Sequence, residues 1–328
     1  RMYNSTLADE GNSAVSKNIA NIDKVVPTTP TSVSITVATN SVTATATGSS
    51  DTLSGLSKYQ YSLNNSTWQD SGTFSGIKSG TATTVYARAV DKVGNVSGSI
   101  SNKGTTTGLG AVTITQSPTA WTNGNVTVTL SHAAVSGYTL QYKIGTGAWT
   151  TYSSALTITD NNTTVYGRMY NATLADEGNS AVSKNIANID KVAPVTPTSV
   201  SITVGTNSVT ATATGSSDTL SGFSKYQYSL NNSTWQDSGT FSGIKSGTNT
   251  TIYAKAIDKV GNESASVSNK GTTTAISGTV AIAQNPAAGT WTKGNVTVTL
   301  SYANIPSGYA IQYKLGSGSW TAYSSALT

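Results

Sequence analysis

An internal repeat constrains this chain more than any other feature. Residues 1–30 match residues 168–197 at all but three positions, and the match continues downstream at the same offset. The run SKYQYSLNNSTWQDSGTFSGIKSG at Ser57 recurs unchanged at Ser224. Self-similarity at a fixed period is typical of modules that fold alike and are joined in tandem. The 328 residues therefore hold about two copies of one repeated unit.

Each of these units is itself double. The segments YQYSLNNSTW and LQYKIGTGAW both place a Trp seven residues after a Tyr. Four such pairs occur along the chain: Tyr61 with Trp68, Tyr142 with Trp149, Tyr228 with Trp235, and Tyr313 with Trp320. This predicts modules of two alternating types, A and B. Their predicted ranges are 1–26 for the C-terminal half of a type-B module, 27–108 for type A, 109–193 for type B, 194–275 for type A, and 276–328 for the N-terminal half of a type-B module.

The spacing within each Tyr–Trp pair predicts a β-hairpin. A two-residue turn at Asn64 and Asn65 would place Tyr61 directly across from Trp68, because Asn tolerates the positive φ that such turns require. Tyr61 alternates with polar residues along its strand, so we expect Trp68 to join its apolar face in the core. The eight paired aromatic residues are therefore predicted to be structural, in preference to a stacking platform for sugars.

Alternating segments such as SVSITV, SVTATAT and NVTVTL have the period of two expected of half-buried strands. Segments such as SSDTLSG, DKVGN and TDNN supply turns between them. No window has a convincing helical period, and only 10% of the residues are charged. About seven short strands in each module predict an all-β protein built of β-sandwiches.

Two groups of motifs resemble known modules. The segments VYARAVDKVGNVSGS and SSDTLSGLSKYQYSLNNSTW of type A resemble the bacterial immunoglobulin-like and fibronectin-III-like modules of secreted surface proteins. The type-B segment, from WTNGNVTVTL to the linker NIDKVAP, resembles a common companion repeat. The resemblance covers essentially the whole chain. It implies tandem immunoglobulin-like β-sandwiches and an extracellular place on a bacterial cell surface, in proteins where such modules mostly serve as spacers.

Composition excludes several partners and sites. The formal net charge of +5 comes from scattered Lys and Arg, whereas a nucleic-acid groove needs a concentrated basic patch. No apolar run reaches the roughly 20 residues of a membrane span. The chain has no cysteine, so disulfides and thiolate metal sites are excluded.

Candidate catalytic residues are few, and we predict that this segment is not an enzyme. His132 is the only histidine, and Tyr302 occupies the matching position of the second copy, so no repeated Ser-His dyad can form. The acidic pairs Asp9-Glu10 and Asp176-Glu177 are predicted to lie in solvated loops. Asp51 and Asp218 fall in the SSDTLSG turns. Together with the two acidic pairs, they are the candidate glycosidase carboxylates. A glycosidase needs a second carboxylate at a defined distance from the first, and none is evident from the sequence.

The two DKVGN segments are the candidate calcium sites. Asp91 with Asn95, and Asp258 with Asn262, offer oxygen ligands on an inter-strand loop. Calcium needs six or more oxygen ligands, however, and each loop carries a single carboxylate. The sequence therefore favours turns stabilised by local hydrogen bonds, and no cofactor is predicted.

A structural segment of an exported bacterial stalk, fibre or filament is the predicted function. An adhesin that binds polysaccharide or a host protein, and a spacer of a large secreted glycoside hydrolase, are the alternatives. The predicted partners are further copies of the chain, by covalent continuation or by head-to-tail or lateral association, and surface polysaccharide in the adhesin alternative. Because 276–328 and 1–26 read as complementary halves of a type-B module, we expect both to be interior parts of a longer periodic chain.

Overall fold

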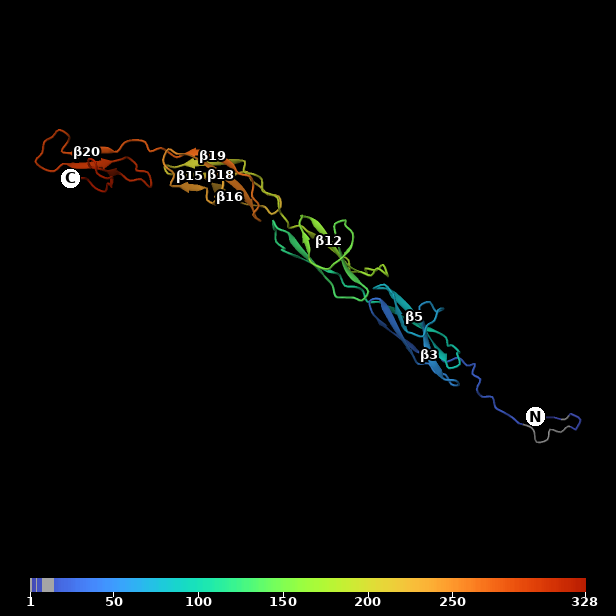
Figure 1. Cartoon of the computed structure of the whole chain (residues 1–328). Helices are drawn as coiled ribbons and strands as arrows, with labels where there is room; N and C mark the ends of the chain where they lie inside the picture. The colour runs from blue at the N-terminus through green and yellow to red at the C-terminus, as the bar shows by residue number, and fades with distance from the viewer. Residues whose placement is uncertain (1, 4, 8–14) are drawn as a thin grey trace. The chain divides into compact units, whose positions relative to one another are not determined.

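A computed structural model describes residues 2–3, 5–7 and 15–328, and its regular elements are all β-strands (Figure 1). The chain forms two compact units. The first comprises 1–116, 127–156 and 163–186, and the second comprises 117–126, 157–162 and 187–328. The described part of the chain contains no helix long and apolar enough to cross a membrane.

The first type-A module is a sandwich of two antiparallel sheets. Its strands are β1 (Ser32–Val37), β2 (Ser41–Thr47), β3 (Leu56–Ser62), β4 (Thr73–Ser75), β5 (Ala82–Asp91) and β6 (Ile100–Thr105). One sheet has the order β1-β2-β4 and the other β3-β5-β6. Two sheets made of the first, second and fourth strands and of the third, fifth and sixth correspond to the sheets of an immunoglobulin-type sandwich.

Alternation along the strands builds the core of this module. Val42, Ala44 and Ala46 on β2 are buried, while the residues between them are exposed. They pack with Tyr61 of β3 and Val85 of β5 in one apolar cluster. The Tyr61 hydroxyl reaches across this core and accepts a hydrogen bond from the Ala46 N–H at 3.0 Å. The strand period read from the sequence is therefore confirmed.

The second type-A module repeats the first strand for strand. Its strands are β14 (Ser199–Val204), β15 (Ser208–Thr214), β16 (Phe223–Ser229), β17 (Thr240–Ser242), β18 (Asn249–Asp258) and β19 (Val267–Thr272). Its sheets have the orders β14-β15-β17 and β16-β18-β19. Even the bulge at the start of β3 recurs at the start of β16. Both modules are thus the same antiparallel sandwich.

The type-B range has seven strands. They are β7 (Thr113–Ser117), β8 (Val126–Ser131), β9 (Thr139–Ile144), β10 (Thr150–Thr151), β11 (Leu156–Ile158), β12 (Thr163–Tyr170) and β13 (Val182–Ile186). They form a β11-β8-β7 sheet and a β10-β9-β12-β13 sheet. All three complete modules are immunoglobulin-like β-sandwiches.

The ranges at the two ends differ from the complete modules. Four strands form two two-stranded sheets in 276–328: β20 (Ala281–Asn285), β21 (Thr297–Ser301), β22 (Gln312–Tyr313) and β23 (Thr321–Ala322). The described residues of 1–26 form no strand, and Asp9 and Glu10 lie outside the described residues.

The predicted hairpin register is wrong by one residue. Tyr61 exchanges hydrogen bonds with Gln69, at 2.8 and 2.9 Å, so Trp68 is not its partner. The loop is longer than two residues because the Asn64 side chain accepts the N–H groups of two following residues. Since side chains alternate across a strand, the shift sends Trp68 to the outer face of its sheet. Its ring there lies 4.3 Å from the Arg88 guanidinium carbon.

The same shift occurs in the type-B range. Tyr142 pairs with Thr150 instead of Trp149. The Trp149 ring stacks on the Arg168 guanidinium, with its centroid 4.0 Å from the guanidinium carbon. The type-A copy places Lys255 over Trp235, and the last range places Lys314 over Trp320. Trp68, Trp149 and Trp235 therefore belong to cation–π contacts on outer sheet faces, whereas Trp320 also lines an apolar groove in 276–328.

We expect Trp68→Ala to cost about 1 kcal/mol, because it removes an outer-face cation–π contact and partial packing. A Trp in the core would cost about 3–5 kcal/mol. Hydrogen exchange of β5 peptides in the full chain measures the change. The β18 peptides serve as the internal reference, because they are unaltered in this variant and their sequence distinguishes them from the β5 peptides. A loss of protection throughout β5 would show that Trp68 is a core residue.

Candidate functional site

Three carboxylates meet beside each type-A module. They are Asp23, Asp51 and Asp91 in the first unit and Asp190, Asp218 and Asp258 in the second. Within each triad the facing ligand atoms all lie within 4.8 Å of one another. One member comes from the linker before the module, one from the loop before the third strand, and one from the end of the fifth strand. The two triads occupy equivalent positions in the two copies of the sequence repeat.

The DKVGN turn fixes the last carboxylate of each triad. Asp91 Oδ1 accepts the backbone N–H groups of Val93, Gly94 and Asn95 at 2.7–3.0 Å. The Asn95 side chain donates to Asp91 Oδ2 at 2.7 Å. The predicted local hydrogen bonds of this turn are therefore confirmed. Asp91, Asn95 and their copies Asp258 and Asn262 remain candidate calcium ligands.

The SSDTLSG turn fixes the middle carboxylate. Asp51 Oδ2 accepts the N–H groups of Leu53 and Gly55 at 3.1 and 2.7 Å. Asp51 Oδ1 is buried and has no hydrogen-bond partner. A buried carboxylate oxygen without a donor is costly, because its desolvation is not compensated. This turn therefore leaves an unpartnered carboxylate oxygen next to the other two carboxylates.

The linker supplies the third carboxylate. Asp190 is fully buried, and its side chain accepts the Ser221 and Val192 N–H groups, both at 2.9 Å. The Asn262 amide donates to the backbone oxygens of Asp190 and Val192 at 3.0 and 3.2 Å. Asn262 therefore holds the linker against the module by its amide nitrogen, as Asn95 does in the first copy.

Opposing effects set the charge of the linker carboxylates. Burial alone would raise the pKa of Asp190, but the adjacent Ser221 side chain and the Ser221 and Val192 amides lower it below its usual value. The Ser54 side chain is the main cause of the lowered pKa of Asp23. Burial would likewise raise the pKa of Asp91, but the hydrogen bonds of its turn outweigh that effect and lower it. These groups are therefore anionic at neutral pH.

The sequence singled out only one residue of each triad, Asp91 or Asp258, as a candidate metal ligand. It placed Asp51 and Asp218 in turns and did not single out Asp23 or Asp190. The members of either triad are spread over most of a module in sequence, so no single loop shows them together. The available signal was the joint recurrence of all three Asp residues in the second copy of the repeat.

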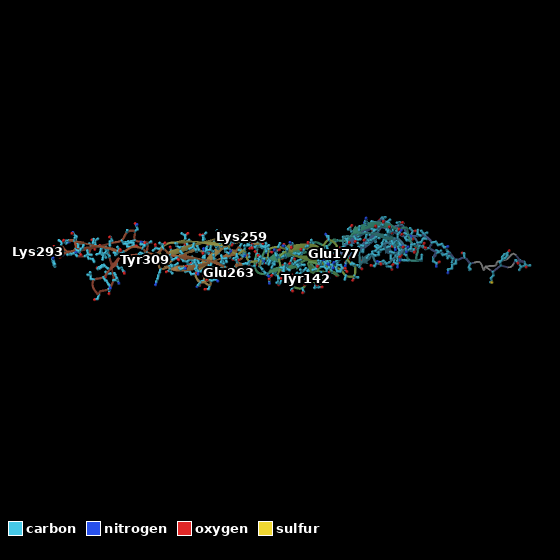
Figure 2. All side chains as sticks on the ribbon, turned by 90° about the horizontal axis from the view of Figure 1, so that it is seen from above. Tyr142, Glu177, Lys259, Glu263, Lys293 and Tyr309 are labelled. Atoms are coloured by element: carbon cyan, nitrogen blue, oxygen red, sulfur yellow. The ribbon has the colours of Figure 1, made fainter. Side chains whose placement is uncertain are left out.

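Asp176 corrects a second prediction. The LADEGNS segment was expected to be a solvated loop, but Asp176 is only 7% exposed. Its Oδ2 accepts the Ser79 N–H and hydroxyl at 2.9 and 2.8 Å and the Tyr138 hydroxyl at 2.5 Å. Glu177, labelled in Figure 2, is half-exposed and pairs with Arg168. Asp176 thus joins the first type-A module to the type-B range.

His132 also has a structural place. Its Nδ1 and Nε2 atoms lie 2.6 and 2.9 Å from the carbonyl oxygens of Ala133 and Gly110. Tyr302, at the matching position, donates to the Ser277 carbonyl oxygen. Both side chains therefore tie the end of the second strand to the segment before the first strand.

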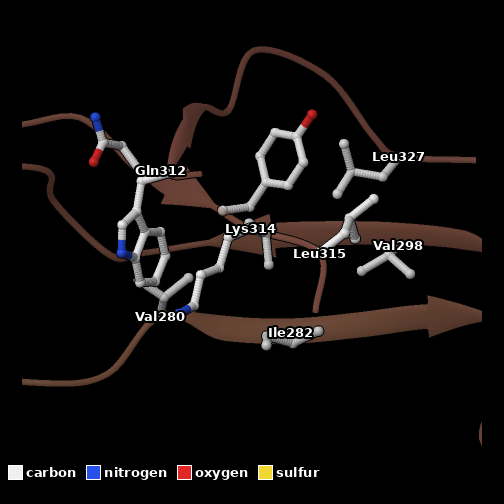
Figure 3. Close-up of a pocket in the computed structure, with 10 residues that line it drawn as sticks. Val280, Ile282, Val298, Gln312, Lys314, Leu315 and Leu327 are labelled. Carbon is white, nitrogen blue, oxygen red and sulfur yellow. The ribbon is translucent and has the colours of Figure 1, made fainter. Parts of the chain in front are cut away.

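An apolar groove of about 410 Å³ opens in 276–328, between Ile282, Val298 and Leu327 (Figure 3). Its wall residues Val280, Val298 and Leu300 correspond in sequence to the core residues Val112, Val128 and Leu130 of the complete type-B range. There, β12 passes over Val112 and Leu130, the counterparts of Val280 and Leu300. The aliphatic part of the groove therefore has the composition of a sandwich core.

No protein-family model matches the chain, and no significant match is found among curated proteins. Solved structures give weak similarities to runs of consecutive domains. The three N-terminal domains of the bacteriophage RB49 outer capsid protein Hoc are 14% identical, with a TM-score of 0.37, and the match covers 75% of this chain and 99% of that one. A group of titin domains is 12% identical, with a TM-score of 0.33 and coverages of 76% and 99%.

A tetra-tandem repeat from the extending region of a large adhesion protein is 17% identical to the chain. Its TM-score is 0.30, and the match covers 76% of this chain and 74% of that one. These similarities concern the fold alone. The sheet orders described above define the tandem immunoglobulin- and fibronectin-III-like sandwiches of this chain.

Proposed function

We propose that this chain is a non-catalytic structural segment of an exported bacterial stalk, fibre or filament. The proposal rests on the linker before each type-A module, which is hydrogen-bonded to that module in the same way in both copies. Asp23 accepts the Ser54 N–H at 2.9 Å, and Asp190 accepts the Ser221 N–H at the same distance. A linker bonded in the same way twice supports a role in which the spacing of modules matters.

The second linker is held at both of its ends. Ile189 forms a β-bridge with Thr122, and the Asn188 amide donates to the Ala120 carbonyl oxygen at 2.7 Å. One residue further on, Asp190 bonds to the second type-A module. Such bonds resist bending of the linker, and Pro194 and Pro197 restrict it further.

The outer-face aromatic residues do not favour the adhesin alternative. Stacking within the sheet already gives Trp68 and Trp149 a structural role, because each ring lies against an arginine of its own sheet. We therefore favour the structural role, in which the modules set a spacing, over the adhesin alternative.

Electron microscopy of intact source cells, labelled with a gold-conjugated antibody to this chain, tests the proposal. We expect label on extracellular filaments or stalks, with an axial period that matches one or two modules. Label confined to the cytoplasm, or extracellular label on isolated particles without a period, would contradict it. Binding of the purified chain to a polysaccharide array at micromolar concentration would favour the adhesin alternative.

A further inference from the structure

We propose that each aspartate triad binds one calcium ion and thereby joins the linker to the type-A module that follows it. The sites comprise Asp23, Asp51 and Asp91 in one case and Asp190, Asp218 and Asp258 in the other. The inference is independent of filament assembly, because each site lies within a single compact unit.

The spacing of the carboxylates fits a single ion. Calcium–oxygen distances are about 2.3–2.6 Å, so two ligands of one ion are at most about 5 Å apart. All ligand atoms of a triad meet this limit, with separations of no more than 4.8 Å. Carboxylates that bind in one or two modes, with backbone oxygens and water, can complete the six to eight ligands that calcium takes.

Charge within each triad also calls for a cation. Three neighbouring carboxylates repel one another, and an opposite charge favours their ionised form. Among the described residues, the ion pairs of Lys and Arg involve none of the six carboxylates. Lys92 and Lys259 extend over Gly55 and Gly222 nearby, but neither forms such a pair.

Unpartnered buried oxygens provide a second, independent observation. Ser221 is only 7% exposed, its N–H donates to the Asp190 carboxylate at 2.9 Å, and its hydroxyl meets no hydrogen-bond partner in acceptable geometry. In the first triad, Asp51 Oδ1 is buried and has no partner either. Buried polar atoms are rarely left unsatisfied in folded proteins, and a bound ion is one established reason for an exception. These atoms therefore mark a ligand position in both triads.

Calorimetric titration of the full chain, stripped of metal with EDTA, tests the proposal. We expect two calcium ions to bind per chain, with a Kd of about 10⁻⁵ to 10⁻³ M. Asp218→Asn should remove one of the two ions and leave the site at Asp51 unchanged. The control variant Asp237→Asn, an exposed carboxylate paired with Lys225, should still bind two ions.

Three results would overturn the proposal: no binding at millimolar calcium, two ions retained by the Asp51→Asn, Asp218→Asn double variant, or magnesium bound as tightly as calcium. Should Asp218→Asn fail to fold, carbodiimide labelling of the unaltered chain replaces the variant. We expect millimolar calcium to reduce labelling of Asp51 and Asp218 at least tenfold, with Asp70 and Asp237 unaffected. Equal labelling of Asp51 and Asp218 with and without calcium would refute the site.

Discussion

Gly72→Ala should unfold the first type-A module and leave the second one folded. A Cβ atom at this position would lie 2.0 Å from the Ala44 carbonyl oxygen, which belongs to the backbone of β2. The backbone cannot move away freely, because the Ala44 N–H donates to the Gly72 carbonyl oxygen at 2.9 Å. We expect a loss of at least about 3 kcal/mol in the free energy of unfolding, as for other severe backbone clashes.

Hydrogen exchange of the full chain measures this effect in each module separately. Peptides from β5 should lose protection, while those from β18 report the intact copy, in which Gly239 has the same surroundings. Gly80→Ala is the matched control, because its φ of +66° carries a backbone penalty of about 1 kcal/mol but no atom lies within 4 Å of the new Cβ. Protection of β5 as high in Gly72→Ala as in Gly80→Ala would contradict the predicted clash.

The strands could be predicted from sequence because the alternating pattern that specifies each strand lies within a few consecutive residues. SVTATAT alternates strictly, and β2 buries Val42, Ala44 and Ala46 as the period of two requires. The hairpin at Asn64 could not be predicted in the same way. Its register depends on whether the Asn64 side chain accepts hydrogen bonds from the N–H groups that follow it. These bonds lengthen the turn, and the resulting shift places Trp68 on the outer face of the sheet instead of in the core.

The acidic residues show the same difference between local and distant information. The local turn around Asp91 was predicted correctly, since its donors lie only a few positions further along the chain. Asp176 was assigned to solvent because its partner Ser79 is distant in sequence. The triads likewise assemble from a linker and two loops, which only the folded chain brings together. Apart from the hairpin register at Asn64, the features that the sequence patterns missed are contacts at the junctions between modules.

Asp176→Ala should open the contact between the first type-A module and the type-B range while leaving their sheets folded. The substitution removes the acceptor of the Ser79 N–H and hydroxyl and of the Tyr138 hydroxyl. Tyr138 stays protonated and able to donate, because burial and the neighbouring Asp176 raise its pKa. Hydrogen bonds to a charged group contribute about 1.5–3 kcal/mol each. Because the donors on Ser79 and Tyr138 would stay partly buried without an acceptor, we expect the contact to weaken by about 3 kcal/mol.

Acid should have the same effect on the unaltered chain. Burial alone would raise the pKa of Asp176, but hydrogen bonds from Tyr138, Ser79 and Gly178 lower it below the unfolded value. Its stabilisation is therefore complete above about pH 4 and is lost as the pH falls through the lower, folded-state pKa. Hydrogen exchange at Ser79, measured against pH, should show protection lost at low pH in the unaltered chain and absent at every pH in Asp176→Ala. Glu177→Gln, which changes the adjacent half-exposed carboxylate, should retain the protection, and an Asp176→Ala chain with full protection at Ser79 would refute this role.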